Sequence, residues 1–458
     1  MNDLKHIYNA CDPFVPATEE DYYDCSEARG SGSLTLEFQR HLGLAEDYLS
    51  FLFSGHLGCG KSSELRNLER VLEAYAPGRP CCFPVYVDAS EYLDDYDVAT
   101  VDILLAIVTE LASALREELG IELKDDYFAK RVDEIKAYFL SPAEINEGEL
   151  SLGFAKAKIQ RLKKDPTARQ NVRKVLEPKM ATMVEEINTV LDKARLQLAN
   201  AAPRYKDLVF IVDNLEKIRR VAGMEEGRAS LRELFVERYT QLTGMKAHFI
   251  YTVPLPLVRS SDAPILESWY GTLFVLPMVK IVRRGTREPF DAGIESLRAL
   301  VQKRIAPLNL DEAFQNEALQ FLVTYSGGIV RDLMAFIQES CTHVNGLPIT
   351  LGAAHRAVQP RVRTFSTSVP EDHWEKLAKL DLSPDQKIPN NDPDHLTMLE
   401  NLTALEYRNG DDEGSPFAPA EPWYAVNPIV RELEKFKAAR SRLAAIEPKS
   451  APPDSPQT

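Results

Sequence analysis

The stretch FLFSGHLGCGKSSEL, residues 51–65, is the part of the chain that most strongly indicates its fold class. It passes from apolar residues through three glycines within six positions to a lysine and two serines. Residues 55–62 match the pattern G-x-x-x-x-G-K-[ST] of a phosphate-binding P-loop. Glycines let the backbone turn tightly and approach a phosphate without Cβ clashes, and the exposed N–H groups form a nest for anions.

The surroundings of this P-loop support a nucleotide site. The apolar run 48–53 predicts a short strand before it, and residues 62–75 predict a helix whose positive end faces the phosphates. Lys61 is expected to meet the β- and γ-phosphates of ATP, and Ser62 to bind Mg²⁺. The residues predicted to hold the nucleotide are Gly55, His56, Leu57, Gly58, Cys59, Gly60, Lys61, Ser62 and Ser63.

A second strand supplies the acid that a P-loop requires. In KDLVFIVDNLEKI, the apolar run Leu208–Val212 predicts a buried parallel strand, and Asp213 follows at its carboxyl end, where ligands bind in such sheets. We expect Asp213 to share the Mg²⁺ with the P-loop serine. Glu216 is the best available acid to polarise a water, whereas Asn214 could only orient one; a solvated acid at a helix start is the alternative for Glu216.

Three further apolar runs predict strands of the same sheet: 83–87, 249–253 and 272–279. Thr252 stands where a hydroxyl could sense the γ-phosphate, although a strand-end threonine without a role fits the pattern almost as well. Residues 317–341 predict two helices separated by a Gly-Gly break. Arg331 falls in the first turn of the second helix, where the helix dipole disfavours a cation. A γ-phosphate bound nearby would compensate for that unfavourable position.

Taken in order, these motifs resemble the AAA+ and STAND branches of the P-loop ATPases, especially ATPases akin to replication initiators. SGHLGCGKSSEL resembles Walker A, LVFIVDN Walker B, IYTVP the sensor-1 strand and SGGIVRDLM sensor 2. The resemblance spans about residues 33–341. It implies a parallel sheet of order 5-1-4-3-2, a helical lid, and Arg29 near the adenine. AAA+ enzymes usually have Glu where this chain has Asn214; an acid three positions after the Walker B Asp is closer to STAND proteins and favours a slow switch.

The expected architecture is an α/β P-loop core with a long helical insertion, because about 120 residues separate the second strand from Walker B, far more than a compact unit needs. The C-terminal strands 405–407 and 423–426 resemble the wing of a winged helix. The predicted divisions are an N-terminal segment near the adenine (1–45), the ATPase core (46–290) with its insertion at about 120–205, a lid carrying sensor 2 (291–365), a winged-helix-like domain (366–445) and a disordered tail (446–458).

The insertion carries an apolar stripe and a basic block. Apolar residues at three-four spacing over 172–198 predict one long amphipathic helix that packs along its stripe. The basic block, Lys156–Lys174, has eight Lys/Arg and one acid, Asp165. A solvated helical face is one interpretation; contact with nucleic acid or with an acidic protein is the other.

Charge elsewhere favours a protein partner over nucleic acid. The whole chain has a formal net charge of -15, and the segment Asp381–Glu413 holds nine Asp/Glu against two Lys/Arg. That segment includes the expected recognition helix 392–405, which phosphates would repel. The winged-helix-like domain is therefore predicted to bind protein or to dock on its own chain.

Composition places the chain among cytoplasmic globular proteins. Hydrophobic residues make up 44% and charged residues 27%, no run is long and apolar enough for a membrane span, and the start lacks the layout of a signal peptide. Six cysteines without a C-x-x-C pair predict reduced thiols. For the adjacent Cys81 and Cys82, burial is favoured over a redox or metal role.

The leading hypothesis is a Mg²⁺-dependent ATPase, hydrolysing slowly, that acts as a switch or assembly subunit on a partner protein; a homo-oligomer is an open alternative for its assembly. By analogy between folds alone, such proteins serve in antiviral defence or DNA transactions. One alternative is a DNA-loading ATPase of the initiator type, which salt-dependent DNA binding would reveal. The other is a non-hydrolysing nucleotide-bound scaffold, which would release no phosphate.

Overall fold

The computed structural model describes residues 2–74, 81–123, 160, 162–218, 231–389, 391–409 and 422–446. The predicted disordered tail lies almost wholly outside them. The chain forms two compact units. The first unit comprises Met1–Gly32, His56–Gly60 and Leu276–Thr458, and the second comprises Ser33–Gly55 and Lys61–Val275. The P-loop is therefore divided, because its residues 56–60 cluster with the first unit.

The second unit contains a five-stranded sheet whose order confirms the prediction. Its strands are β1 (Ser50–Gly55), β2 (Phe83–Asp88), β3 (Leu208–Asp213), β4 (His248–Pro254) and β5 (Leu273–Leu276). They lie in the order β2-β3-β4-β1-β5, which is 5-1-4-3-2 counted from the other edge. The pairs β1·β4, β3·β4 and β2·β3 are parallel. All six residues of β3 are buried, as its continuous apolar run predicts.

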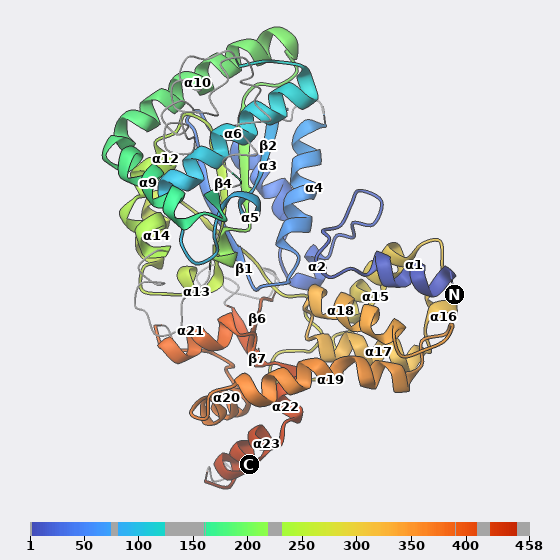
Figure 1. The fold of residues 1–458 in the computed structure, drawn as a ribbon. Coiled ribbons are helices and arrows are strands. Elements are labelled where there is room, and N and C mark those ends of the chain that lie inside the picture. Colours follow the sequence, from blue (N-terminus) through green and yellow to red (C-terminus); the bar gives the residue numbers. More distant parts are fainter. Residues whose placement is uncertain are drawn as a thin grey trace, which may run out of the picture. The chain divides into compact units, whose positions relative to one another are not determined.

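Helices of the second unit cover this sheet (Figure 1). They are α3 (Leu34–Leu44), α4 (Lys61–Glu73), α5 (Ala89–Tyr92), α6 (Thr100–Leu119), α9 (Pro166–Leu176), α10 (Met180–Ala201), α12 (Tyr239–Thr243), α13 (Leu255–Val258) and α14 (Ala263–Tyr270). Two 3-10 turns, η1 (Glu177–Lys179) and η2 (Leu215–Lys217), and a π turn, η3 (Glu233–Glu237), complete the described elements. Helix α4 follows the P-loop and packs on β2 and β3, so the sheet fixes the start of the phosphate-facing helix.

The long amphipathic helix predicted over 172–198 is divided in two. Helix α9 ends at Leu176, the turn η1 contains Pro178, and α10 begins at Met180. Proline lacks the N–H that an α-helix requires and forces this break. The apolar stripe still serves for packing, since its members on both helices are buried: Val172, Leu176, Met180, Met183, Ile187, Val190, Ala194 and Leu198.

The first unit is mainly helical. Its helices are α1 (Asn2–Ala10), α2 (Ser26–Arg29), α15 (Asp291–Ile305), α16 (Leu310–Ala313), α17 (Asn316–Ser326), α18 (Val330–Cys341), α19 (Leu351–Ser368), α20 (His373–Leu382), α21 (Pro393–Glu400), α22 (Pro428–Glu432) and α23 (Glu434–Ile446). Helices α17, α18 and α19 pack side by side, with α1 against α18 (Figure 1). Gly327 caps α17 in the left-handed conformation, with φ 64°, and produces the predicted break before α18.

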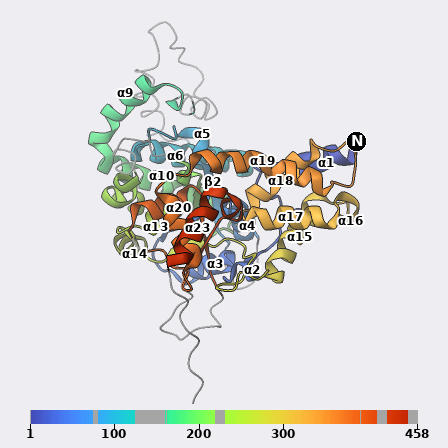
Figure 2. The ribbon, with the colours of Figure 1, turned by 90° about the horizontal axis from the view of Figure 1, so that it is seen from below.

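The two strands predicted near the C-terminus form an antiparallel hairpin, β6 (Ala404–Tyr407) with β7 (Trp423–Val426), hereafter the C-terminal hairpin. The Tyr407 and Trp423 rings stack at 4.7 Å between centroids. Helix α20 packs against α23 and β7, and Figure 2 shows α20 and α23 next to each other. Helices around a two-stranded hairpin are the content expected of a winged-helix-like domain.

All six cysteines are buried and outside any disulfide, which confirms the burial predicted for Cys81 and Cys82. Within the described ranges, no helix is both long and apolar enough to cross a membrane.

Candidate nucleotide site

The P-loop lysine is held by its own loop and by a buried acid. Lys61 Nζ lies 3.3 Å from Glu216 Oε1, with the two side chains 3% and 6% exposed. Lys61 also donates a hydrogen bond of 3.0 Å to the Gly55 carbonyl oxygen. Since β1 ends at Gly55 and η2 holds Glu216, the predicted phosphate-binding cation and the predicted base lie in contact.

The two predicted metal ligands are also brought together. Asp213 ends β3 fully buried, and its carboxylate accepts hydrogen bonds from the Ser62 side chain, from Tyr86 Oη at 2.6 Å and from the Asn214 N–H at 2.7 Å. Burial, and then the neighbouring Glu216, raise the pKa of Asp213. A carboxylate and a hydroxyl at the carboxyl end of a strand, next to a P-loop, suit a Mg²⁺ ion.

Glu216 is buried, so the interpretation of it as a solvated acid is wrong. Burial opposes its charge, but Lys61 and a hydrogen bond from Thr252 outweigh that effect and lower the pKa of Glu216. The Thr252 hydroxyl also accepts the Leu215 N–H at 3.0 Å, which fixes the start of η2. Glu216 Oε2 is buried without a hydrogen-bond partner. The predicted sensor residue thus positions the predicted base.

Asn214 is engaged elsewhere. Its backbone is left-handed, with φ 69°, and its Nδ2 donates to Asp88 Oδ1 at 2.8 Å. Asp88 ends β2 directly opposite Asp213 in the parallel register. Neither Asp88 nor Tyr86 was assigned a role from the sequence. Their signal is a polar residue at or near the carboxyl end of a strand neighbouring Walker B.

In the first unit, both predicted arginines reach the part of the P-loop that lies there. Arg29 is 3% exposed; its Nη1 donates to the Pro277 carbonyl and its Nη2 to the Cys59 carbonyl, the latter at 2.7 Å. The Arg331 N–H donates to the Gly58 carbonyl at 3.0 Å. The Nε atoms of both arginines are buried without a hydrogen-bond partner.

Two P-loop glycines are required where these arginines approach. Gly58 has φ 79°, and a Cβ there would lie 2.7 Å from Arg331 Cβ. Gly60 has φ 107°, and its Cβ would lie 3.3 Å from Arg29 Nη2. Any side chain at Gly58 would be strained and would also displace Arg331.

His56 has partners that the sequence did not reveal. As a variable position of the P-loop pattern, it gave no signal beyond proximity to phosphate. Its ring is 2% exposed and contacts the backbone of Leu399 and of Glu406. These contacts join residues more than 340 positions apart in sequence, which no local pattern reports.

Considered one unit at a time, these residues suit the chemical groups of a magnesium nucleotide. The second unit offers a lysine, a hydroxyl and two buried acids, one with an unpartnered oxygen. The first unit offers two arginines with unpartnered buried Nε atoms beside glycines whose missing side chains leave the backbone open to close approach. Cations and free backbone N–H groups suit phosphates, whereas acids beside a hydroxyl suit the ion.

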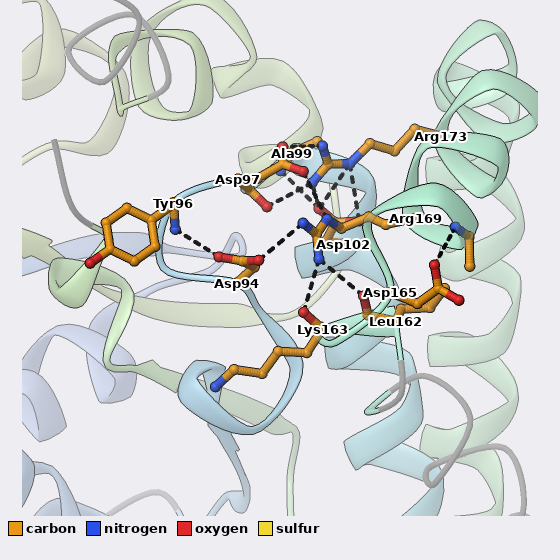
Figure 3. A network of polar contacts seen from close by, with 11 residues as sticks. Asp94, Tyr96, Asp97, Ala99, Asp102, Leu162, Lys163, Asp165, Arg169 and Arg173 are labelled. Carbon is orange, nitrogen blue, oxygen red and sulfur yellow. Dashed lines mark hydrogen bonds and ion pairs between the residues drawn. The ribbon is translucent and has the colours of Figure 1, made fainter. Parts of the chain in front are cut away.

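The basic block does not form one external surface. Figure 3 shows Arg169 and Arg173 of α9 directed at three aspartates, two of them between α5 and α6 and the third in the first turn of α6. Arg169 pairs with Asp94 and Asp97, and Arg173 pairs with Asp97 and Asp102.

The interpretation of these two arginines as contacts for an outside partner is therefore wrong, because buried guanidinium groups require local carboxylates. Lys163 also donates to the Ser90 carbonyl oxygen, while Lys164 and Lys174 are exposed. The predicted members Lys156, Lys158 and Arg161 lie outside the described residues.

The acidic C-terminal segment is likewise partly neutralised. Asp381 is 4% exposed and pairs with three arginines, namely Arg287, Arg431 and Arg440. Lys376 pairs with both Asp392 and Asp394. Counting charges within Asp381–Glu413 therefore overstated its repulsion of phosphates, because four of these partners come from outside the segment.

Comparisons with known proteins give similar folds only. No model of a known protein family matches the chain, and no curated protein matches it. Similar solved structures include a Walker-type ATPase of Pyrococcus abyssi, at 16% identity over 94% of this chain and 99% of that one, with TM-score 0.45. Another is Drosophila ORC bound to DNA, at 11% identity over 95% of this chain and 91% of that one, with TM-score 0.40. A third is the Aeropyrum pernix ORC2 protein, at 11% identity over 90% of this chain and 93% of that one, with TM-score 0.40. The P-loop ATPase fold itself rests on this chain's strand order and motifs.

Proposed function

We propose that the protein binds ATP with Mg²⁺ at its P-loop and hydrolyses it slowly, as a nucleotide-dependent switch or assembly subunit. The observation that supports this most directly is the buried Lys61–Glu216 pair, in which Glu216 keeps one unpartnered oxygen. A buried acid with an unused oxygen beside the P-loop lysine suits the role of a base toward a water near the γ-phosphate.

Each side chain has a role in this proposal. Lys61 meets the β- and γ-phosphates, and Ser62 with Asp213 holds the Mg²⁺, which supplies positive charge to the phosphate oxygens. Glu216 accepts a proton from the attacking water. Thr252 holds Glu216 through its hydroxyl, and the positive charge of Arg331 binds the γ-phosphate.

ATP must compete with Glu216 for Lys61. In the contact described above, Lys61 lowers the pKa of Glu216 and so weakens it as a base. When Lys61 turns to the phosphates, that effect declines and Glu216 becomes more basic. Binding would thereby activate the base, while Asn214, an amide already bound to Asp88, can take no proton.

The output is proposed to be a partner protein, in the cytoplasm. Six buried cysteines that form no disulfide suit that compartment. Internal pairing of Arg169 and Arg173 removes two of the charges that a DNA-loading function would have used. A homo-oligomer and a place in antiviral defence rest on analogy between folds alone.

The first test is ATP binding by calorimetry with and without Mg²⁺. We expect the wild type to bind Mg²⁺–ATP, Lys61→Ala to lose most of that affinity, and Asp213→Asn to lose the Mg²⁺ dependence. Lys174→Ala, which removes an exposed lysine, is the matched control and should bind normally. Equal affinity in Lys61→Ala and the wild type would refute the phosphate site.

The non-hydrolysing scaffold is the second candidate, and the Lys61–Glu216 pair also supports it, because an acid held by the P-loop lysine is withheld from water. Phosphate release at saturating ATP separates the two. Tight ATP binding without any release would favour the scaffold.

A further inference from the structure

The P-loop is joined to the C-terminal hairpin through one histidine. His56 Nε2 lies 2.8 Å from the Glu406 backbone nitrogen, and His56 Nδ1 lies 3.2 Å from the Leu399 carbonyl oxygen. The ring is 2% exposed, and Glu406 is buried at 3%. Both contacts lie within the first unit. Phosphate binding by backbone N–H groups does not require a histidine here, so the ring serves another purpose.

The chemistry of the two partners fixes the form of the ring. The Glu406 N–H can only donate, so His56 Nε2 must be the unprotonated acceptor. The Leu399 carbonyl can only accept, so Nδ1 must carry the proton. One neutral tautomer satisfies both partners, which makes this a directional link between the loop and the hairpin.

His56 contacts strand β6 on the edge that faces away from β7. Glu406 lies opposite Tyr424 in the register with β7, yet its N–H turns to His56 and its carbonyl accepts the Met278 N–H at 3.3 Å. In antiparallel pairs, alternate residues direct both backbone groups away from the partner strand. His56 therefore occupies a position on the edge of β6 that an added strand would otherwise take.

The same strand also contacts the turn that precedes Arg331. Tyr407 Oη donates to the Gly327 carbonyl at 2.7 Å. A Cβ at Gly327 would lie 2.7 Å from Leu405 Cδ1, so the turn and β6 are in close contact. Since the Arg331 N–H bonds Gly58, strand β6, the sensor turn and P-loop residues 56–60 form one connected set.

We propose that His56 is a positioning residue that transmits the nucleotide state of the P-loop to the C-terminal hairpin. This inference rests on the proposed ATP binding and goes beyond it by naming the element that responds. A bound triphosphate fixes the backbone of residues 56–60, and the two hydrogen bonds of His56 carry that restraint to Glu406 of β6 and to Leu399 of α21. The ordered hairpin is then the surface by which a partner distinguishes the ATP state.

The test is hydrogen exchange of the full-length protein, read at 404–407 and 423–426, with and without saturating Mg²⁺–ATP. For the wild type we expect ATP to slow exchange there by about fivefold, the factor expected for one buried hydrogen bond. His56→Leu removes both hydrogen bonds at similar size and should abolish this response. Calorimetry on each variant sets the ATP concentration at which its site is full.

A matched pair of variants keeps the test decisive if His56→Leu does not fold. His56→Gln places an amide oxygen near the position of Nε2 and should retain the response through Glu406. His56→Asn reaches only the position of Nδ1 and should lose it. A merely structural histidine would make the two variants differ in stability but not in their response to ATP.

Each outcome has one meaning. If the wild type fails to bind ATP, the proposed function fails, and this inference with it. If the wild type binds ATP but exchange at the hairpin does not change, the inference is overturned while the ATP site stands. A full response in His56→Leu or in His56→Asn at saturating ATP also overturns it.

Discussion

Glu216 is a buried charge compensated by Lys61 and by the hydroxyl of Thr252. Removing one member of a buried ion pair leaves an uncompensated charge, at a cost of about 3–5 kcal/mol. Lys61→Ala therefore changes stability as well as binding, and its stability should be measured alongside its affinity. Lys61→Met, which fills the same space, is the more informative companion because it isolates the loss of charge.

Glu216→Gln tests the base while keeping the shape of the side chain. We expect phosphate release at saturating ATP to fall by about 10²- to 10⁴-fold, the usual contribution of a general base. ATP affinity should rise, because Lys61 no longer has to leave a charged partner. Glu177→Gln, an exposed glutamate, is the control. Wild-type turnover in Glu216→Gln would assign the base to another group.

At the scale of residues, the sequence singled out side chains that the structure brings into contact, such as Lys61 with Glu216 and Ser62 with Asp213, but it did not predict most hydrogen-bond partners. Lys61, Ser62, Asp213 and Thr252 were identified because a motif or a strand end places each of them. The partners of His56 and Tyr86 were not predicted, because they come from elements distant in sequence. A pattern along the chain cannot report a hydrogen bond across such separations.

Among the elements, buried strands were the most predictable. An apolar run such as that of β3 has few alternatives once a P-loop fixes the fold class. For the helix over 172–198, the predicted buried face was right but the predicted continuity was wrong. The apolar periodicity persists through Pro178, whereas the helical hydrogen bonding does not.

The prediction of an external basic surface was wrong for a different reason. Charge counted along a sequence does not show which charges turn inward.

Arg173→Met tests the network that joins α9 to the start of α6 and to the segment before it. The arginine side chain is 13% exposed and that of its partner Asp102 is 10% exposed. Its loss should destabilise the protein by about 3–5 kcal/mol in urea unfolding, since Asp102 would remain buried without its cation. Lys174→Met changes the exposed neighbour and should have little effect. Equal stability of the two variants would contradict the structural role.

Acid should weaken the contact between α20 and the start of α21. Partial burial opposes the charge of Asp392, but hydrogen bonds from Lys376 and from the Asp394 N–H lower its pKa from 3.8 to about 2. A carboxyl whose pKa is lowered by folding stabilises the fold above its unfolded value and loses that effect as the pH falls through the folded one.

The advantage of the wild type over Lys376→Met should therefore be constant above about pH 5 and shrink between about pH 4 and about pH 2. Urea unfolding of both proteins across this range measures it. Lys379→Met, in which an exposed lysine of the same helix is changed, is the control. A difference between wild type and Lys376→Met that does not depend on pH would show that packing, rather than charge, is responsible.

For the whole molecule, the net charge of -15 and the internal use of Arg169 and Arg173 predict weak binding to duplex DNA. We expect affinities no tighter than about 10⁻⁶ M at physiological salt, the range of non-specific binding. Changing two exposed lysines of the described part of the basic block together, Lys164→Glu with Lys174→Glu, should then alter binding little. Tight, salt-dependent binding that this double variant abolishes would instead support the DNA-loading alternative.

The division of the chain into two units could not be read from its motifs. The P-loop looks like one continuous element in sequence, yet residues 56–60 cluster with the C-terminal half and Lys61 with the central sheet. Only contacts distant in sequence, such as those of Gly58 and His56, produce that division.

The burial of every cysteine has a practical consequence for following such changes. Burial raises the pKa of the Cys11, Cys82 and Cys341 thiols to about 12, so little reactive thiolate forms at neutral pH. The unaltered chain should react slowly with maleimide dyes. A cysteine in place of the exposed Lys164 and a second in place of the exposed Lys435 would then accept a fluorophore pair, and the native cysteines could stay. Energy transfer between the two dyes would report, molecule by molecule, whether ATP changes the distance between the central sheet's insertion and the C-terminal helices.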